Sequence, residues 1–365
     1  MMCINEFKWL KYDFIIAGGS DHMSNVRDIK RIYLNFAPNI KIRFVGRDLA
    51  IQRVIEWAEE GMWKPAVIFG PEGCGKTAWL KQSIEILKSY DYDVIYVNPF
   101  ERILDTTLGV ASLKKRLTQI FREALKTNVW GGVINTAIDV VREAIRVGRG
   151  KIAVIIDEAF QMIKTIEASS YIKALLGVME HPPSHYERIV AIVATSEGRS
   201  RAEIGRHEWS DLIPMWNMSK NDFRELYDQI PGERPSFEDV WRITGGNPRI
   251  FRQLYSMRWN IDDAIDYIVR SKELTPDFIS RWRRSLEEAV EDPDSIWRSE
   301  TSREFIDELI RKNLIVYNLY ERRPGLWIDD PPPEKDLEIG VGRYVAWQTP
   351  LYREAVRKAL KKIDR

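Results

Sequence analysis

The stretch Ala66-Val-Ile-Phe-Gly70-Pro-Glu-Gly-Cys-Gly75-Lys76-Thr77 decides the fold. From Gly70 onward it reads G-x-x-x-x-G-K-T, the pattern of a phosphate-binding loop. The apolar run before the loop has the length and β-branched content of a buried strand, and apolar side chains recur at helical spacing after it. Strand, glycine-rich loop and helix therefore follow one another in the order that phosphate binding requires.

The loop residues have defined chemical roles in this pattern. The glycines let backbone N–H groups converge on phosphate oxygens at the positive end of a helix dipole. Lys76 is placed to reach the β- and γ-phosphates, and the Thr77 hydroxyl to ligate Mg²⁺. The alternative is a glycine-rich turn that binds nothing. We predict that ATP and Mg²⁺ bind here, with the nucleotide held by Gly70, Gly73, Cys74, Gly75, Lys76, Thr77 and Ala78.

Composition describes an ordinary globular chain. Its 365 residues predict two or three domains, and 44% hydrophobic with 30% charged residues allows a substantial core. The 55 basic and 54 acidic residues nearly cancel, which argues against a chain that mainly wraps nucleic acid but leaves room for a local basic patch. No run of 18 apolar residues occurs, so we expect no membrane span and no membrane partner.

Cysteine and histidine usage excludes two classes of site. Two cysteines, Cys3 and Cys74, cannot build a disulfide framework, which fits a reducing cytoplasm. Cys74 is either a redox-sensitive thiol or a small residue tolerated in the loop. The four histidines are scattered without metal-ligand spacing, so a zinc site is not expected.

A second signal is Lys151-Ile-Ala-Val-Ile-Ile-Asp157-Glu158. A continuous apolar run that ends in two carboxylates is typical of a buried parallel strand with acids at its carboxyl end, where ligands bind in open α/β sheets. Asp157 would hold Mg²⁺, and Glu158 would orient or deprotonate the attacking water. Alone, the same pattern also describes a helix cap or a turn. The phosphate loop upstream favours the catalytic interpretation.

Another apolar run, Arg188 to Ala194, predicts a neighbouring buried strand, and Leu212 to Trp216 predicts an edge strand. Thr195 or Ser196, after the first of these runs, would hydrogen-bond the γ-phosphate or the water, unless it is a helix cap. Of the two we favour Thr195 as the catalytic residue. Arg201 and Arg206 are placed in a loop, where each would act on a neighbouring subunit's phosphate or remain on the surface.

A turn before the first strand, Phe44-Val45-Gly46-Arg47-Asp48, leads into a helical pattern. The backbone near Val45 and Gly46 would contact adenine, and Arg47 would approach the phosphates or a structural carboxylate. The alternative is a plain helix start capped by Asp48.

Two helical patterns, 110–127 and 134–147, form a long insert broken at residues 130–132, and a further helix is expected near 159–180. After residue 219 the pattern becomes helical, with segments at 261–271 and 276–290. Within it, Asn247 is a good N-cap and Pro248 a good first helical residue. Arg249 would point back at the nucleotide or lie on the surface.

The last segment begins at Pro293. A helix after Thr301, strands at 313–317 and 342–348, a short strand at 326–328 and a final helix after Pro350 suggest a winged-helix module. Residues 281–365 contain 17 basic and 17 acidic residues, which favours a protein-contact or self-inhibiting module over a strong DNA reader. The best DNA-facing candidates are Arg281, Arg283 and Arg284.

In their order, these motifs resemble the archaeal ATPase family, within the STAND and AAA+ group of P-loop NTPases. The resemblance covers residues 40–360 and rests on Phe44–Asp48, Gly70–Thr77, Ile155–Glu158, Ala194–Ser196, Thr244–Arg249 and Pro350–Tyr352. It implies an α/β core with a parallel five-stranded sheet of order 5-1-4-3-2, a helical lid and a C-terminal winged helix, with ATP between core and lid. It also implies that Thr195 or Ser196 matches the first sensor position, that Pro248 contacts the nucleotide and that Arg249 matches a second sensor.

We therefore expect an N-terminal extension (1–40), an ATPase core (41–218), a lid (219–291) and a winged-helix domain (292–365). The leading hypothesis is a slow, ATP-driven conformational switch with a protein partner or self-association. Three alternatives remain: a DNA-binding, initiator-like ATPase, a small-molecule kinase, and a nucleotide-binding scaffold without turnover.

Overall fold

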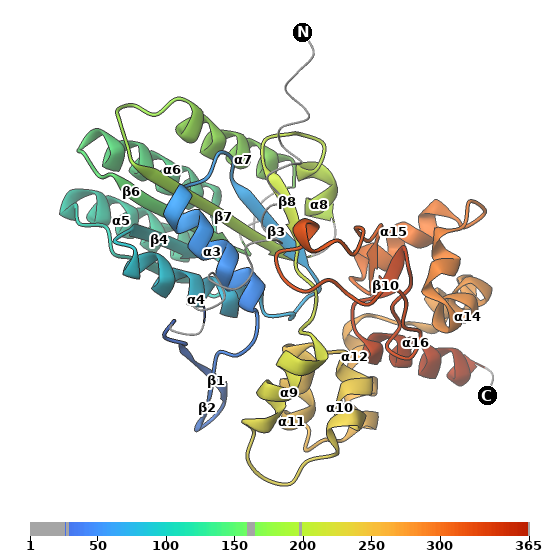
Figure 1. The fold of residues 1–365 in the computed structure, drawn as a ribbon. Coiled ribbons are helices and arrows are strands. Elements are labelled where there is room, and N and C mark those ends of the chain that lie inside the picture. The colour runs from blue at the N-terminus through green and yellow to red at the C-terminus, as the bar shows by residue number, and fades with distance from the viewer. Residues whose placement is uncertain (1–25, 27–28, 159–164, 197–198, 364–365) are drawn as a thin grey trace.

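A computed structural model describes residue 26 and residues 29–158, 165–196 and 199–363. Residues 1–25 of the expected N-terminal extension and residues 159–164 of the expected helix near 159–180 lie outside the described residues. Figure 1 shows a sheet layered between helices, a helical group below it, and a C-terminal segment beside both.

The central sheet has six strands in the order β5-β4-β6-β7-β3-β8. Its five parallel strands lie in the order β8-β3-β7-β6-β4, and the antiparallel β5 pairs with β4 at the edge. The sheet is therefore one strand larger than predicted, because the start of the insert folds back along β4. The strands are β3 (Ala66–Gly70), β4 (Asp93–Asn98), β5 (Ile103–Thr106), β6 (Lys151–Asp157), β7 (Arg188–Ser196) and β8 (Asp211–Pro214).

Alternate side chains of the buried strands serve two cores, as the two-residue period of a strand requires. Ile152, Val154 and Ile156 of β6 face one core, and Ala153 and Ile155 face the other. The first core is closed by α5 (Ala111–Thr127), α6 (Gly131–Arg146), α7 (Thr165–Glu180) and α8 (Arg199–Ile204). The second is closed by α3 (Asp48–Glu60) and α4 (Lys76–Ser89). The result is a three-layer α/β/α core.

Local predictions around the sheet need three corrections. Arg201 lies in α8 rather than in a loop. Gly131 and Gly132 form the first turn of α6, and the break before it falls at Asn128, whose φ of 58° ends α5. A hairpin of β1 (Tyr33–Ala37) and β2 (Ile40–Arg43) was not predicted and lies largely within the expected extension.

Residues 219–291, which the sequence predicts to form a lid and which are called the lid region below, contain six helices within the described residues: α9 (Lys220–Asp228), α10 (Phe237–Thr244), α11 (Pro248–Ser256), α12 (Ile261–Ser271), α13 (Pro276–Arg281) and α14 (Arg283–Glu291). The predicted bounds of α12 are confirmed. The single helix predicted at 276–290 is wrong, because it is interrupted at Trp282, whose ring packs 5.3 Å from that of Phe305.

The C-terminal segment contains η2 (Pro293–Trp297), α15 (Arg303–Arg311), β9 (Ile315–Tyr317), η3 (Pro324–Leu326), β10 (Val345–Trp347) and α16 (Pro350–Ile363). β9 and β10 pair antiparallel. The strand predicted at 326–328 is wrong: Leu326 ends a 3₁₀ turn that begins at Pro324. One hydrophobic core joins α11–α14 to α15 and α16, so the lid helices and the C-terminal segment pack as neighbours. None of the helices among the described residues is long and apolar enough to cross a bilayer.

Candidate nucleotide site

The phosphate loop connects the carboxyl end of β3 to the first residue of α4. Lys76 is almost fully buried, and its ammonium donates hydrogen bonds to the carbonyls of Gly70 and Pro71, both at 3.0 Å. Gly75, which precedes α4, has a φ of 106°, a conformation that favours glycine. The loop therefore places the Lys76 ammonium at the positive end of α4. Phosphate oxygens bound there would interact with both the ammonium and the helix dipole.

The lid contributes the start of α11 to the same loop. Asn247 caps this helix by accepting from the N–H groups of Arg249 and Ile250, as predicted. The Arg249 N–H donates to the Gly73 carbonyl at 3.3 Å, and a Cβ on Gly73 would overlap the Arg249 side chain. The predicted lid residues Pro248 and Arg249 thus lie directly beside the loop.

Asp157 lies at the carboxyl end of β6 and is fully buried. One carboxylate oxygen, Oδ2, accepts from the Tyr96 hydroxyl at 3.0 Å and from Asn98 Nδ2 at 2.9 Å. The other oxygen, Oδ1, has no hydrogen-bond partner in the described part of the chain. Burial raises the Asp157 pKa, an effect that Thr77, Tyr96 and Lys76 oppose. A buried carboxylate with one unsatisfied oxygen next to Thr77 and Lys76 fits a cation site.

Glu158 follows Asp157 with a φ of 52°, which is unusual for a residue with a side chain. Its N–H donates to the Ala194 carbonyl at 3.0 Å, which ties this turn to β7. Burial raises the Glu158 pKa, with Lys76 opposing and Asp157 and Glu72 adding to the rise. A partly buried carboxylate with a raised pKa is suited to accept a proton from water.

Thr195 and Ser196 end β7, the strand that pairs with both β3 and β6. Thr195 is buried, and its Oγ1 has no hydrogen-bond partner among the described residues. The Ser196 backbone hydrogen-bonds the Glu158 carboxylate. Buried polar groups are rarely left unpaired, so Thr195 is the better placed of the two to meet a further polar group.

The turn at residues 44–48 lies between the core and α9 of the lid. Gly46 has a φ of 65°, and a Cβ there would overlap the Asp222 side chain of α9, so only glycine fits. The Arg47 N–H donates to Asp222 Oδ2 at 3.2 Å. Val45 packs with the lid core. The alternative of a cap by Asp48 is wrong: Arg47 is the N-cap position, and the helix start has no side-chain cap.

Arg47 contacts a structural carboxylate, one of the two options that the sequence left open. Its buried guanidinium pairs with the buried Asp329 at 2.8 Å and also donates to the carbonyls of Cys74 at 2.6 Å and Trp216 at 2.9 Å. Asp329 belongs to the C-terminal segment. Arg47 therefore ties the phosphate loop to that segment.

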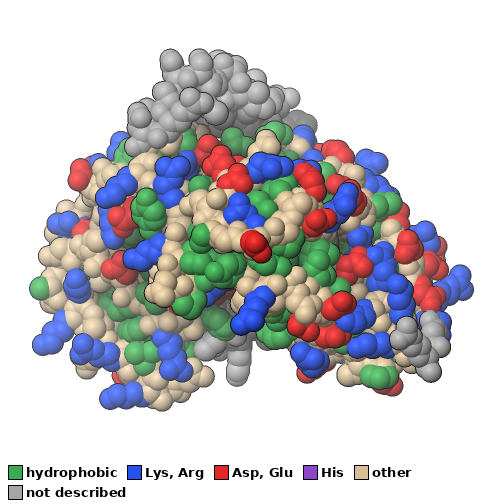
Figure 2. Space-filling view, turned by 90° about the horizontal axis from the view of Figure 1, so that it is seen from below, with side chains coloured by type: hydrophobic (Ala, Val, Ile, Leu, Met, Phe, Trp, Pro, Cys, Tyr) green, Lys and Arg blue, Asp and Glu red, His purple; other side chains and the backbone are tan. Residues whose placement is uncertain are grey.

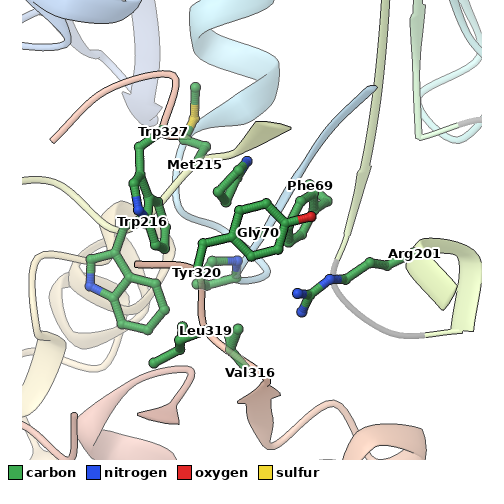
Figure 3. Close-up of a pocket in the computed structure, with 11 residues that line it drawn as sticks. Phe69, Gly70, Arg201, Met215, Trp216, Val316, Leu319, Tyr320 and Trp327 are labelled. Carbon is green, nitrogen blue, oxygen red and sulfur yellow. The ribbon is translucent and has the colours of Figure 1, made fainter. Parts of the chain in front are cut away.

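Arg201 likewise joins the core to the C-terminal segment. It donates to the carbonyls of Tyr317 and Asn318, both at 2.8 Å, and lies 4.5 Å from the ring centre of Phe69. Figure 3 shows its guanidinium directed at Tyr320 and Phe69, beside a small pocket next to Gly70. Arg201 therefore makes its contacts within its own chain. Arg206 is exposed and pairs with Glu203 at 3.3 Å.

Cys74 is a fully buried residue of the loop. Reactive cysteines are partly exposed, so its burial favours the small-residue interpretation over a redox-sensitive thiol.

A residue that the motif left unassigned, Glu72, connects the loop to two other regions. Its carboxylate pairs with Arg249 of α11, with Lys272 at 3.4 Å and with Asn313 Nδ2 at 3.1 Å. Burial raises the pKa of Glu72, but Arg249 and Lys272 more than offset this and hold it below its usual value. The Glu72 N–H also donates to Gln348 Oε1 at 2.9 Å. An acid inside a phosphate-binding loop was the sequence signal that could have identified this junction.

Residues 44–254, more than half of the chain, match the model of a family described as an ATPase domain predominantly from Archaea. The chain belongs to this family. The matched range contains the turn, the loop, the two carboxylates, Thr195 and the start of α11. The archaeal ATPase resemblance inferred from the motifs is thereby confirmed.

No curated protein matches the sequence of this chain. Solved structures with a similar fold include Aeropyrum pernix ORC2 in ADPNP–ADP complexes (16% identity, 62% of this chain and 68% of that one, TM-score 0.40). Another is AMPPCP-bound DnaA from Aquifex aeolicus (18% identity, 68% of this chain and 68% of that one, TM-score 0.37). A third is Cdc6p from Pyrobaculum aerophilum (16% identity, 92% of this chain and 100% of that one, TM-score 0.36).

The Arg47–Asp329 pair leads to a stability prediction. Asp329→Asn would leave a buried guanidinium without its carboxylate, so we expect a loss of about 2–3 kcal/mol in unfolding free energy by urea titration, below the full cost of a broken buried pair because two carbonyls still accept from Arg47. The control is Glu101→Gln, which breaks a half-exposed pair with Lys81 and should cost under about 1 kcal/mol. Equal losses in the two variants would contradict a stabilising role for the buried pair.

Proposed function

We propose that this protein is a Mg²⁺-dependent ATPase that acts as a slow, nucleotide-driven conformational switch, with ATP held between the core and the lid. The observation that carries the proposal is the position of Glu72. This residue lies in the phosphate loop and contacts α11, Lys272 and the C-terminal segment through one side chain. A change in the loop would therefore reach both neighbouring regions.

The residues present fit the Mg²⁺ that this family of reactions uses. The buried Asp157 has an unsatisfied Oδ1, and the Thr77 hydroxyl lies close to it. The part of the chain that the structure describes holds no group of three or more His, Cys, Asp or Glu side chains suited to a metal. Mg²⁺ does not need such a group, because it is bound by one or two protein oxygens together with phosphate and water.

In this proposal each residue of the chain has a separate task. Lys76 exchanges its bonds to the Gly70 and Pro71 carbonyls for bonds to phosphate oxygens. Glu158 orients the attacking water and accepts its proton, and Thr195 Oγ1 hydrogen-bonds the water or the γ-phosphate. Bound Mg²⁺ would neutralise charge that develops on the phosphates. Val45 and Gly46 line the adenine side, and Pro248 and Arg249 close the lid side.

The lid and the C-terminal segment are the moving parts in this switch. We assign the helix–strand–strand–helix order of α15, β9, β10 and α16 to a winged-helix domain, as the sequence suggested. The predicted DNA-facing residues lie just before this segment, in α13 and α14, and each is paired with an acid: Arg281 with Glu304, Arg283 with Glu287 and Arg284 with Glu288. This pairing favours a protein-contact role for the segment over the initiator-like alternative.

Phosphate release from ATP without any acceptor is the test of the proposed activity. A slow, steady release that requires Mg²⁺ supports the ATPase and argues against a small-molecule kinase. A flat phosphate signal, with nucleotide binding intact, would instead identify a scaffold without turnover.

The Glu72 junction yields a prediction about coupling. Glu72→Gln removes the charge that pairs with Arg249 and Lys272, so ATP should still bind within about threefold, since the loop backbone and Lys76 are unchanged. We expect the ATP-dependent change in hydrogen exchange to fall in residues 248–256 and 345–349. The control Glu238→Gln breaks only surface pairs with Lys220 and Arg224 and should leave that change intact. An unchanged exchange response in Glu72→Gln would count against the junction as the coupling element.

A further inference from the structure

Helix α5 carries a one-sided charge that the proposed ATPase does not use. Between Ala111 and Thr127 it has one acid, Glu123, and five exposed cations: Lys114, Lys115, Arg116, Arg122 and Lys126. The chain as a whole has a net charge of only +1. In Figure 2, basic side chains with few acidic ones among them gather on the left of the molecule, the side on which Figure 1 places α5.

Three of these cations form a row along the solvent face of α5. Leu113, Leu117, Phe121 and Ala124 are buried against the core, which fixes the opposite face of α5 toward solvent. Lys115, Arg122 and Lys126 are spaced by seven and four residues, so they lie on one line along that solvent face. The row is about 16 Å long at 1.5 Å per residue.

Most of the cations on α5 also have no acidic partner among the described residues. Arg116 approaches Asp139 at 3.7 Å, but Lys114, Lys115, Arg122 and Lys126 form no ion pair with any described residue. Arg281, Arg283 and Arg284 of α13 and α14, by contrast, are each paired with a neighbouring acid. Four of the five cations of α5 therefore lack an ion-pair partner among the described residues, whereas all three arginines of α13 and α14 have one.

We propose that the solvent face of α5 docks on the phosphate backbone of duplex DNA. This docking does not depend on the base sequence of the DNA or on the proposed ATPase activity. A straight row of cations on a rigid helix matches a regular row of phosphates without ordering either partner. A single strand would need aromatic side chains for base stacking, and the α5 row has none. A membrane would need a continuous exposed apolar face, but the apolar stripe of α5 is buried and Leu125 is the one exposed large hydrophobic side chain on the described helix. An acidic protein would need an aromatic or apolar anchor within the row.

The test is fluorescence anisotropy of the full chain with a labelled mixed-sequence duplex of about 20 base pairs, at salt between about 50 and 200 mM. We expect salt-sensitive binding by the wild type. The triple variant Lys115→Glu, Arg122→Glu, Lys126→Glu should bind at least about tenfold more weakly, and its log–log salt slope should be smaller by about 3, since each phosphate contact contributes about 0.9. A single strand of equal length should bind more weakly than the duplex.

The control, Arg252→Glu, Arg258→Glu, Arg270→Glu, makes the same charge change on exposed lid residues. It should retain duplex binding within about threefold, and both variants should keep wild-type phosphate release, which shows that they fold. Four results would overturn the proposal: no duplex binding at low salt, equal losses in the two triples, tighter binding to the single strand or to anionic phosphatidylserine vesicles, or loss only in Arg281→Glu, Arg283→Glu, Arg284→Glu. Since the binding needs no ATP, a chain without ATPase activity that still binds duplex through α5 would sink the proposed function alone.

Discussion

Lys76→Ala is expected to abolish ATP binding in calorimetry at millimolar Mg·ATP. The ammonium is buried at the centre of the loop, within 3.0 Å of two loop carbonyls, where phosphate oxygens would replace them as acceptors. A charge-assisted hydrogen bond contributes about 1.5–3 kcal/mol, and two of them to phosphate correspond to a loss of at least about a hundredfold in affinity.

Lys81→Ala provides the matched control for this variant. Lys81 lies in the same helix, but its ammonium is partly exposed and pairs with Glu101 at 2.9 Å. It should bind ATP as the wild type does. Since Lys76 also holds the loop carbonyls, a thermal melt should accompany the titration. A normal heat of ATP binding in a folded Lys76→Ala protein would show that the phosphate loop does not bind ATP.

Glu158→Gln should retain ATP binding within about threefold and lose turnover by about 10²–10⁴-fold, the usual contribution of a general base. Glutamine preserves the size and hydrogen-bonding of the side chain but cannot accept the proton from water. The measurements are a binding titration and single-turnover phosphate release on the same preparation. Glu85→Gln, an exposed acid in α4, is the control and should hydrolyse ATP normally.

The pH dependence offers an independent check on this role. Burial and the neighbouring acids raise the Glu158 pKa, so its basic form is lost as pH falls through a value above the ordinary glutamate range. The wild-type rate should therefore decline with falling pH before an ordinary glutamate would protonate. A rate that stays flat through that range, or normal turnover in Glu158→Gln, would assign the proton transfer to another group.

The sequence by itself determined the parts of this protein that depend on local order. A strand, a loop of glycines and a helix can be recognised without tertiary contacts, because their residue types and periods are set by the backbone. The same holds for the buried strand ending at Asp157 and for the helix start at Asn247. Parallel strands then bring their carboxyl ends together, so the proximity of Asp157 and Thr195 to the loop was predictable.

Only the tertiary structure decided how the remaining charges are used. The carboxylate partner of Arg47 and the partners of Arg201 and Glu72 come from segments more than 100 residues away, and no spacing rule specifies such contacts. Strand β5 also escaped prediction, because four residues paired at a sheet edge carry little periodic signal. Local backbone preference set the elements, whereas packing of the C-terminal segment against the loop selected among several acids and carbonyls for each arginine.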